Sequence, residues 1–245
     1  MNAEAPIEVH NVSLAYRLSH NRAGTLKEFA VNLVKGQVQY EKLIALKDVS
    51  FTVGRGEVFS IIGPNGAGKS TMMKMVARVL PPTSGRVIVR GSVAPMIELG
   101  AGFNPELTGY ENIVLYGTLL GRDPAVMRER ANAIAVWAEL TDFLDVPIRS
   151  YSSGMLARLG FAVATDVQPE ILLVDEVLAV GDESFQRTSK LRMEEMIAQG
   201  TSVVFVSHDL ATVEQIATRT LWLDKGVTKM IGEPSDVIAA YKASV

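Results

Sequence analysis

The sequence predicts an α/β fold organised around a parallel β-sheet, and three features of the 245-residue chain lead to this prediction. A strand-like run, EVFSII, is joined by a glycine-rich loop to a run with helical spacing, STMMKMVARVL. Two apolar runs, ILLVD at 171–175 and SVVFVS at 202–207, are typical of parallel strands that are buried on both faces. Runs with helical periodicity lie between these strands, at 110–120 and 124–144.

The remaining strands are expected near the N-terminus. IEVHNVSLAY at 7–16 alternates in a β-like way, and 45–63 and GRVIVRG at 85–91 also have strand patterns. The helix that follows the glycine-rich loop is expected to stop at Pro81 and Pro82. The chain has no internal repeat, low-complexity tract or flexible linker, so residues 1–245 are predicted to form one folding unit.

The helical runs form a lobe inserted between the strands. Asp123 is a favourable N-cap with Pro124 at the first helical position, which predicts a helix over 124–144. A further helix, MLARLGFAVAT, is expected to begin near Ser153 and Gly154.

Composition excludes several classes of function. The net charge is −3 and the pI about 5.7, without the basic block that a nucleic-acid binder needs, so no nucleic acid is expected as a partner. The chain has no cysteine and only 3 scattered histidines, which argues against a disulfide framework or a thiolate metal site. No run approaches the ~20 apolar residues of a membrane span, so the chain on its own is expected to be soluble.

A phosphate-binding loop is the strongest chemical signal. Residues 63–70, GPNGAGKS, fit the pattern G-x-x-x-x-G-K-[ST] between a strand and a helix. Glycines let successive N–H groups point at an anion, and the helix N-terminus adds its positive dipole. Lys69 is expected to reach the β and γ phosphates, and Ser70 to bind Mg²⁺. An ordinary glycine-rich turn is the weaker alternative.

Two carboxylates follow the apolar strand at 171–175. Asp175 and Glu176 stand at the carboxyl end of this strand, where open α/β sheets bind ligands. We expect Asp175 to hold the metal ion and Glu176 to act on the attacking water. His208 ends the strand SVVFVS in the same way, although a lone histidine there is more often structural.

A second anion site is predicted at SYSSGM, residues 150–155. Ser153 and Gly154 lie where a helix begins, so their N–H groups have no partner inside the helix. In a monomer this patch would be only a serine N-cap. In a two-fold dimer, each helix start can instead close over the γ-phosphate held by the partner chain.

This set of motifs resembles the ATPase subunit of ATP-binding cassette (ABC) transporters, and the likeness covers nearly the whole chain. GPNGAGKST is similar to the Walker A motif, ILLVDE to Walker B with its glutamate, and FVSHD to the switch histidine, His208. YSSGM is similar to the signature motif and LAVGD, with Asp182, to the D-loop. Tyr16 matches the aromatic residue that stacks on adenine. The nucleotide-binding residues implied are Tyr16, Gly63, Pro64, Asn65, Gly66, Ala67, Gly68, Lys69, Ser70 and Thr71.

The resemblance implies a P-loop NTPase (RecA-like) core sheet with an antiparallel β subdomain and an inserted helical subdomain over about 98–165. Two positions depart from the family pattern. The signature reads Ser152-Ser153-Gly154 where the family more often has Ser-Gly-Gly, and Glu98 stands where the Q-loop glutamine is expected. Glu98 is therefore expected to take a water-mediated metal or coupling role.

In these departures the chain resembles the subfamily of cassette ATPases that exports lipid-linked polysaccharides. Residues 17–44 are an insertion relative to most cassette ATPases, and Leu26, Phe29, Ala30 and Leu33 in it form an apolar stripe of a helix over 25–34. This helix either lies at the membrane interface near the substrate entrance or covers the sheet of its own subunit, and the sequence gives both equal weight.

The resemblance implies a dimeric ATPase that uses ATP and Mg²⁺ under a dimeric membrane-spanning permease, peripheral at the cytoplasmic face of the cell membrane. Its catalytic residues would be Glu176, His208 and Lys69. The alternatives are a soluble ABC ATPase that remodels ribosomes or DNA, and a transporter subunit for another substrate. A non-hydrolysing regulatory cassette is disfavoured because all three catalytic residues are present.

Overall fold

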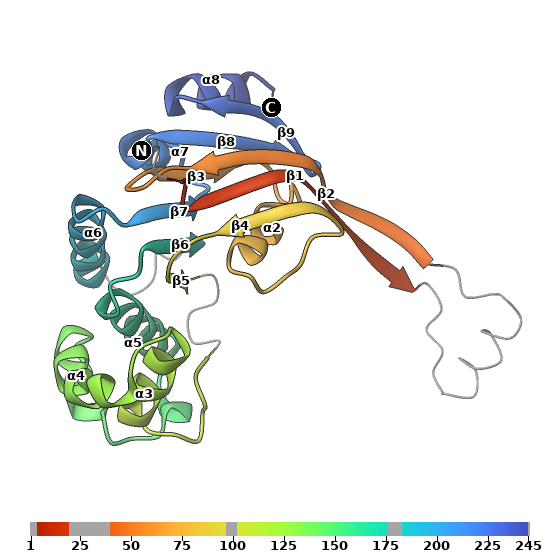
Figure 1. Ribbon diagram of the computed structural model, residues 1–245. Helices are drawn as coiled ribbons and strands as arrows, with labels where there is room; N and C mark the ends of the chain where they lie inside the picture. Colours follow the sequence, from red (N-terminus) through yellow and green to blue (C-terminus); the bar gives the residue numbers. More distant parts are fainter. Residues whose placement is uncertain (1–3, 20–39, 97–101, 176–182, 245) are drawn as a thin grey trace, which may run out of the picture.

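The computed structural model describes residues 4–19, 40–96, 102–175 and 183–244 (Figure 1). The predicted helix over 25–34 therefore lies outside the described residues. The strands are β1 (Ile7–Ser19), β2 (Tyr40–Val53), β3 (Val58–Ile62), β4 (Ser84–Val89), β5 (Val93–Met96), β6 (Ile171–Asp175), β7 (Ser202–Val206), β8 (Arg219–Asp224) and β9 (Val227–Gly232). The α-helices are α2 (Lys69–Val76), α3 (Gly109–Leu119), α4 (Pro124–Trp137), α5 (Ser153–Asp166), α6 (Glu183–Ala198), α7 (Leu210–Ile216) and α8 (Pro234–Ser244), with short 3-10 turns at Thr141–Phe143 and Ile148–Ser150.

A six-stranded sheet in the order β5-β6-β7-β3-β8-β9 forms the centre of the molecule. Its first five strands are parallel, and β9 pairs antiparallel to β8. β3, which leads into the glycine-rich loop, is flanked by β7 and β8. Ser60 of β3 and Thr220 of β8 are both buried, and their hydroxyls lie 2.7 Å apart. This bond satisfies two polar groups inside an apolar sheet.

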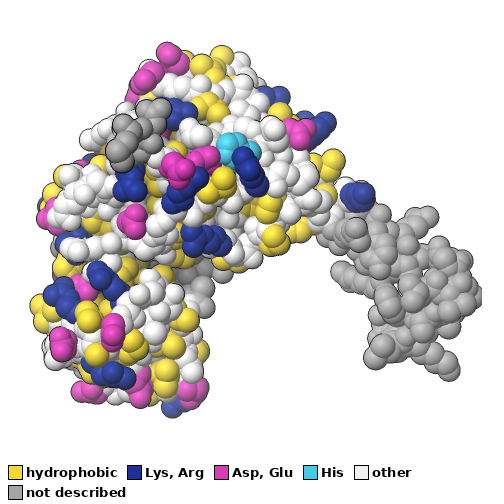
Figure 2. Space-filling view, viewed as in Figure 1, with side chains coloured by type: hydrophobic (Ala, Val, Ile, Leu, Met, Phe, Trp, Pro, Cys, Tyr) yellow, Lys and Arg dark blue, Asp and Glu magenta, His cyan; other side chains and the backbone are white. Residues whose placement is uncertain are grey.

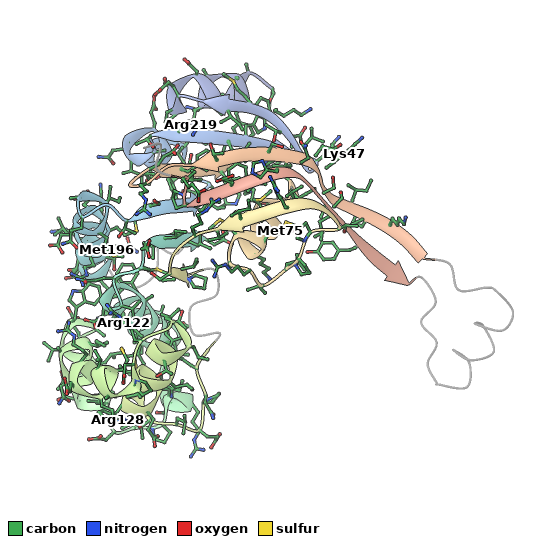
Figure 3. The ribbon with its side chains drawn as sticks, viewed as in Figure 1. Lys47, Met75, Arg122, Arg128, Met196 and Arg219 are labelled. Atoms are coloured by element: carbon green, nitrogen blue, oxygen red, sulfur yellow. The ribbon has the colours of Figure 1, made fainter. Side chains whose placement is uncertain are left out.

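Side chains of the central strands alternate between two apolar cores. Phe59 and Ile61 of β3 pack with α2 and the N-terminal strands, whereas Val58 and Ile62 pack with the helices on the other face. Figure 3 shows Met75 on α2 and Met196 on α6, and these two residues belong to the first and the second core respectively. Burial on both faces explains why these strands read as continuous apolar runs in the sequence.

A separate three-stranded antiparallel sheet, in the order β2-β1-β4, covers the core that contains α2. β4 pairs with β1 only as far as Ser13, while β1 and β2 stay paired up to Ser19 and Tyr40. The ends of β1 and β2 therefore extend away from the body of the molecule (Figure 1). Residues 17–19 and 40–44, assigned to the insertion from the sequence, belong to these two strands.

Helices α3, α4 and α5 form a lobe beside the central sheet (Figure 1). Trp137 of α4, Phe161 of α5 and Phe185 of α6 form a ring cluster with centroids 5.5–6.0 Å apart, which joins this lobe to α6. Ion pairs such as Arg149–Glu106 and Arg158–Glu139 lie on its surface, where basic and acidic side chains are interspersed (Figure 2). Exposed pairs such as Arg149–Glu106 add little stability, so the lobe depends mainly on its apolar contacts.

Two helices end earlier than the sequence predicted. The helix expected over 124–144 stops at Trp137, and the one expected to reach Pro81 stops at Val76. In each case a non-glycine residue, Glu139 (φ 59°) or Arg78 (φ 61°), takes the left-handed conformation just after the helix. Backbone hydrogen bonds from Leu140 to Ala135 and from Val79 to Lys74, both 2.9 Å, close the two ends as Schellman motifs.

The turn between β8 and β9 supports the glycine-rich loop. Lys225 (φ 48°) and Gly226 (φ 77°) form its two residues, as in a type I′ hairpin. The Gly226 N–H donates to the Ala67 carbonyl (3.0 Å), and the Lys47 N–H donates to the Gly226 carbonyl (2.8 Å). A Cβ on Gly226 would lie 2.5 Å from the Ala45 carbonyl oxygen. This turn therefore links β2 to the loop through the backbone alone.

This contact predicts that Gly226→Ala destabilises the protein more than Gly200→Ala. Both glycines have positive φ, but a Cβ on Gly200 would meet nothing within 4 Å. Gly200→Ala should therefore lower the free energy of unfolding by only about 1–2 kcal/mol, the strain of an alanine in the left-handed conformation. Gly226→Ala must also displace backbone atoms, and its melting temperature should lie at least about 3 °C below that of Gly200→Ala. Equal melting temperatures for the two variants would show that the turn can move away without cost.

Candidate active site

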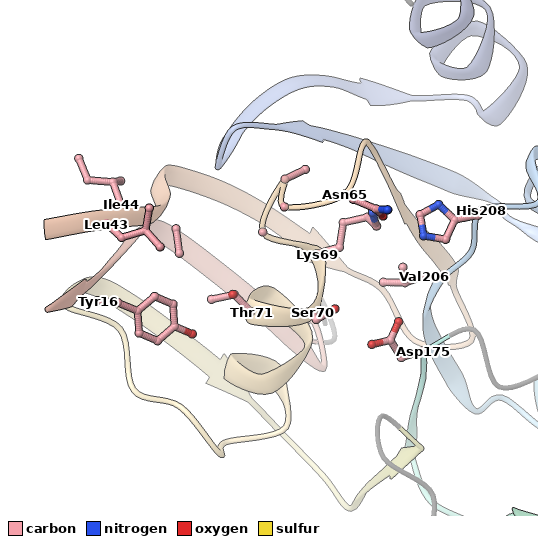
Figure 4. A pocket seen from close by; sticks show the side chains of 14 residues that line it. Tyr16, Leu43, Ile44, Asn65, Lys69, Ser70, Thr71, Asp175, Val206 and His208 are labelled. Atoms are coloured by element: carbon pink, nitrogen blue, oxygen red, sulfur yellow. The ribbon is translucent and has the colours of Figure 1, made fainter. Parts of the chain in front are cut away.

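A cavity of about 620 Å³ lies where the carboxyl ends of β3, β6 and β7 meet the glycine-rich loop (Figure 4). Ligand sites of open α/β sheets occupy this edge because the loops that follow parallel strands converge there. The cavity is lined by Tyr16, Leu43, Ile44, Ala45, Asn65, Gly66, Ala67, Gly68, Lys69, Ser70, Thr71, Asp175, Val206 and His208.

The path of the loop requires glycine at two close contacts. Gly63 has φ 145°, and a Cβ there would lie 2.0 Å from the Leu223 carbonyl oxygen. Gly68 has φ 102°, and a Cβ there would lie 2.7 Å from the Ala45 carbonyl oxygen. Any larger residue would push the loop away from β8 and β2, so the sequence G-x-x-x-x-G fits this backbone and few others.

Helix α2 begins in this loop without a side-chain cap. α3, α4, α5 and α7 are each capped by the side chain of a threonine, aspartate or serine, namely Thr108, Asp123, Ser152 and Asp209. The N-cap of α2 is Gly68, and its first turn contains no acidic residue. The N–H groups and the positive dipole of this helix end therefore face the cavity and are available to an anionic ligand.

Lys69 brings a positive charge into the same space. Its side chain is buried, and Nζ donates hydrogen bonds to the carbonyl oxygens of Gly63 (2.8 Å) and Pro64 (3.1 Å). Burial lowers the pKa of this ammonium group, and the negative charge of Asp175 opposes that effect. A phosphate beside Nζ would supply the negative charge that stabilises the ammonium form.

Ser70 and Asp175 offer oxygen ligands to a metal ion. Burial raises the pKa of the Asp175 carboxyl, while a hydrogen bond from the Ser70 hydroxyl and the positive charges of Lys69, His208 and Lys74 act in the opposite direction. A hydroxyl and a carboxylate side by side match the oxygen ligands that Mg²⁺ prefers. The two residues therefore fit the metal site that the sequence predicts.

Tyr16 and His208 lie at the two ends of the cavity (Figure 4). His208 follows β7 and is exposed. Tyr16 of β1 pairs with Leu43 of β2, and the side chains of Tyr16, Leu43 and Ile44 are 37%, 53% and 56% exposed. An aromatic ring and two aliphatic side chains left this open form an apolar end suited to a flat ring such as a nucleobase.

The second predicted anion site does not line this cavity. Ser152 is the N-cap of α5, and its Oγ accepts a hydrogen bond from the Met155 N–H (3.2 Å). Ser153 and Gly154 are the first two residues of the helix, and Ser153 is exposed on the helical lobe. Within one chain, the two predicted anion sites are separate.

The structure brings most of the sequence-predicted residues together and adds four others. Gly63 and Pro64 are not among the lining residues, and their carbonyl groups accept hydrogen bonds from Lys69. Leu43, Ile44, Ala45 and Val206 line it but were not predicted. Leu43 and Ile44 were assigned to the insertion, and their pairing with Tyr16 and Ala15 respectively becomes visible only in the register of β1 and β2. Glu98, Glu176 and Asp182 lie outside the described residues.

Comparison with known proteins identifies the family. The family described as "ABC transporter" matches residues 46–179. An "O-antigen export system ATP-binding protein RfbB" from Klebsiella pneumoniae is 44% identical over 248 residues, covering 99% of both chains. A "Teichoic acids export ATP-binding protein TagH" from Shouchella clausii is 39% identical over 94% of this chain and 63% of its own length.

The fold is that of a cassette ATPase. A dimeric post-hydrolysis structure of the ATP-binding cassette MJ0796 with ADP and Pi superposes with a TM-score of 0.74, at 23% identity over 93% of this chain and 98% of that one. Among the helices that the structure describes, none has the length and apolar character of a membrane span. The matched family, the relatives and the geometry of the nucleotide cavity agree: this chain belongs to the ABC transporter family and is an ATP-binding cassette ATPase.

Proposed function

We propose that this chain is the ATP-hydrolysing subunit of a transporter that exports a lipid-linked polysaccharide. The observation that carries this proposal is the likeness to an O-antigen export protein, which extends over 99% of both chains. A likeness to a teichoic acid export protein supports the same class of cargo. Both relatives are named for the export of a cell-envelope polymer.

In this proposal the cavity binds ATP with its triphosphate on the glycine-rich loop. The uncapped N-terminus of α2 and the Lys69 ammonium stabilise the phosphate charges, and Tyr16 stacks on the adenine ring. Ser70 and Asp175 hold Mg²⁺, which neutralises part of the phosphate charge when it is bound. Glu176 accepts a proton from the water that attacks the γ-phosphorus, the bond to the ADP oxygen breaks, and His208 contacts the transferred phosphate.

We propose that two copies of the chain share their sites. The N-terminus of α5, with Ser153 and Gly154, lies away from the cavity of its own chain, on the helical lobe. A two-fold dimer places this helix end over the γ-phosphate bound by the partner. ATP then stabilises the closed dimer, and hydrolysis releases it.

The dimer would work beneath a permease dimer at the cytoplasmic face of the cell membrane. Opening and closing of the two cassettes would move the surfaces that contact the permease and so drive export. Asp182 and Glu98 would couple the nucleotide sites to this movement, as their positions in the D-loop and Q-loop imply.

The role of Glu176 predicts the effect of Glu176→Gln. Turnover should fall by at least about 100-fold, the scale of removing a general base, because the amide cannot accept the proton of water. ATP affinity should survive, and size-exclusion chromatography with ATP should show a long-lived dimer. Glu214→Gln on α7, an exposed carboxylate outside the cavity, is the matched control and should keep normal turnover. Loss of ATP binding in Glu176→Gln would give Glu176 a structural role instead.

Shared sites predict that two inactive variants recover activity when mixed. Ser153→Arg blocks the helix end that closes over the partner's ATP, and Lys69→Ala removes the ammonium that holds the phosphates. A mixed dimer then has both lesions in one composite site and none in the other. ATPase activity of the mixture should exceed that of either variant alone. If mixing restores nothing at any ratio while both variants remain folded, Ser153 acts only within its own chain.

A further inference from the structure

Two reciprocal pairs of hydrogen bonds join β1 to β2, at residues that do not themselves line the nucleotide cavity. The Asn11 N–H donates to Ser50 Oγ (2.7 Å), and the Ser50 hydroxyl donates back to Asn11 Oδ1 (3.0 Å). The Asp48 N–H donates to Ser13 Oγ (2.9 Å), and the Ser13 hydroxyl donates back to Asp48 Oδ1 (3.1 Å). We call these pairs, Asn11–Ser50 and Asp48–Ser13, the two serine clasps.

Each clasp fixes a β-bulge. Asn11 (φ 45°) and Asp48 (φ 51°) are non-glycine residues in the left-handed region. Pairing shifts by one extra residue in β1 between Val9 and Val12, and by one extra residue in β2 opposite Ser13. The bulge residues have lost their ladder partners, and the serine hydroxyls replace those hydrogen bonds. Asparagine and aspartate tolerate the left-handed conformation and can accept the returned bond.

The clasps separate two parts of the antiparallel sheet. On the N-terminal side of the clasps in β1, Ile7 and Val9 pair with both β2 and β4 and are buried in the core. After Ser13, among the described strands, β1 pairs with β2 alone. This two-stranded part, the extension, contains Tyr16 and its partner Leu43. The Ala15 N–H donates a hydrogen bond to Thr83 Oγ1 (3.1 Å), which is a further contact where the extension begins. The direction of the extension therefore depends on these two bulges and on a third register shift, between Leu14 and Ala15, that neither clasp holds.

The same segment of β2 is tied to the phosphate loop. Lys47, next to Asp48, donates its N–H to the Gly226 carbonyl, and Gly226 donates to Ala67 in the loop. In β2, Lys47 lies on the same side of the clasps as Leu43, so this strand is tied to the loop independently of the clasps. The clasps instead hold β1, which carries Tyr16, against the tied strand. A rotation of β1 on β2 at the clasps would change the distance between the Tyr16 ring and the phosphate site.

We propose that the two serine clasps are positioning elements that set the nucleobase end of the cavity relative to its phosphate end. This inference rests on the proposed ATP site. With both clasps formed, Tyr16 stays in the place beside Leu43 that a base bound with its triphosphate on the loop requires. Without them, the Tyr16 segment of β1 spends part of its time elsewhere, and the apparent affinity for ATP falls by the fraction of time lost.

The test compares ATP with a ligand that lacks the base. The double variant Ser13→Ala/Ser50→Ala removes both hydroxyls, and inorganic tripolyphosphate with Mg²⁺ probes the phosphate end alone. Titration calorimetry should show the Kd for ATP rising about 3- to 10-fold, the scale of one ordinary hydrogen bond, while the Kd for tripolyphosphate stays within about twofold of wild type. Turnover at saturating ATP should match wild type, because the phosphate end is unchanged.

Two controls isolate the clasps. Ser84→Ala changes the serine of β4 that pairs with Ser13 and belongs to neither clasp, and it should bind both ligands as wild type does. Ser13→Thr/Ser50→Thr keeps both hydroxyls and should restore the affinity for ATP. An unchanged Kd for ATP in the double alanine variant would overturn the inference. So would an equal weakening of both ligands, because that is the result of a general loss of structure. A wild-type chain that binds neither ligand would instead refute the proposed ATP site.

Discussion

The placement of two opposite charges, the buried Lys69 and the partly buried Asp175, in one cavity is the constraint around which the site is built. Lys69 and Asp175 both pay for desolvation, as the lowered pKa of the one and the raised pKa of the other indicate. Their mutual attraction and the carbonyl groups of Gly63 and Pro64 offset only part of that cost. A phosphate beside Lys69 would add the negative charge that offsets the desolvation of its ammonium group. The close backbone contacts of Gly63 and Gly68 fix the path of the loop that carries Lys69.

Most of the phosphate end of the site could be predicted from the sequence because its determinants are local. Gly63, Gly68 and Lys69 follow one another within a single loop, and the close contacts of the two glycines explain why the pattern is so restrictive. Asp175 and His208 were predicted because the carboxyl ends of neighbouring parallel strands meet at one edge, whatever the chain does between them. The mixed α/β architecture followed from the same apolar runs.

The errors arose where a non-local contact or an atypical residue determined the structure. Arg78 and Glu139 end their helices in a conformation that usually selects glycine, so neither position gave a signal. Leu43 and Ile44 reach the cavity only because β2 pairs with β1 in a register shifted by bulges, and no local pattern shows a register shift. The serine clasps were missed for the same reason, since Ser13 and Asp48 are 35 residues apart in the chain.

The position of β3 in the central sheet has a consequence for folding during synthesis. This strand carries the phosphate loop and is made early, yet both of its neighbours, β7 and β8, come from the last part of the chain. The buried hydroxyl pair of Ser60 and Thr220 spans 160 residues, so Ser60 has no partner until β8 has left the ribosome. Pairings of such long range form slowly, because a long stretch of chain must be ordered before they stabilise anything. A ribosome that stalls before residue 219 therefore releases a chain whose loop motif is complete in sequence but cannot be held in the shape that binds a phosphate.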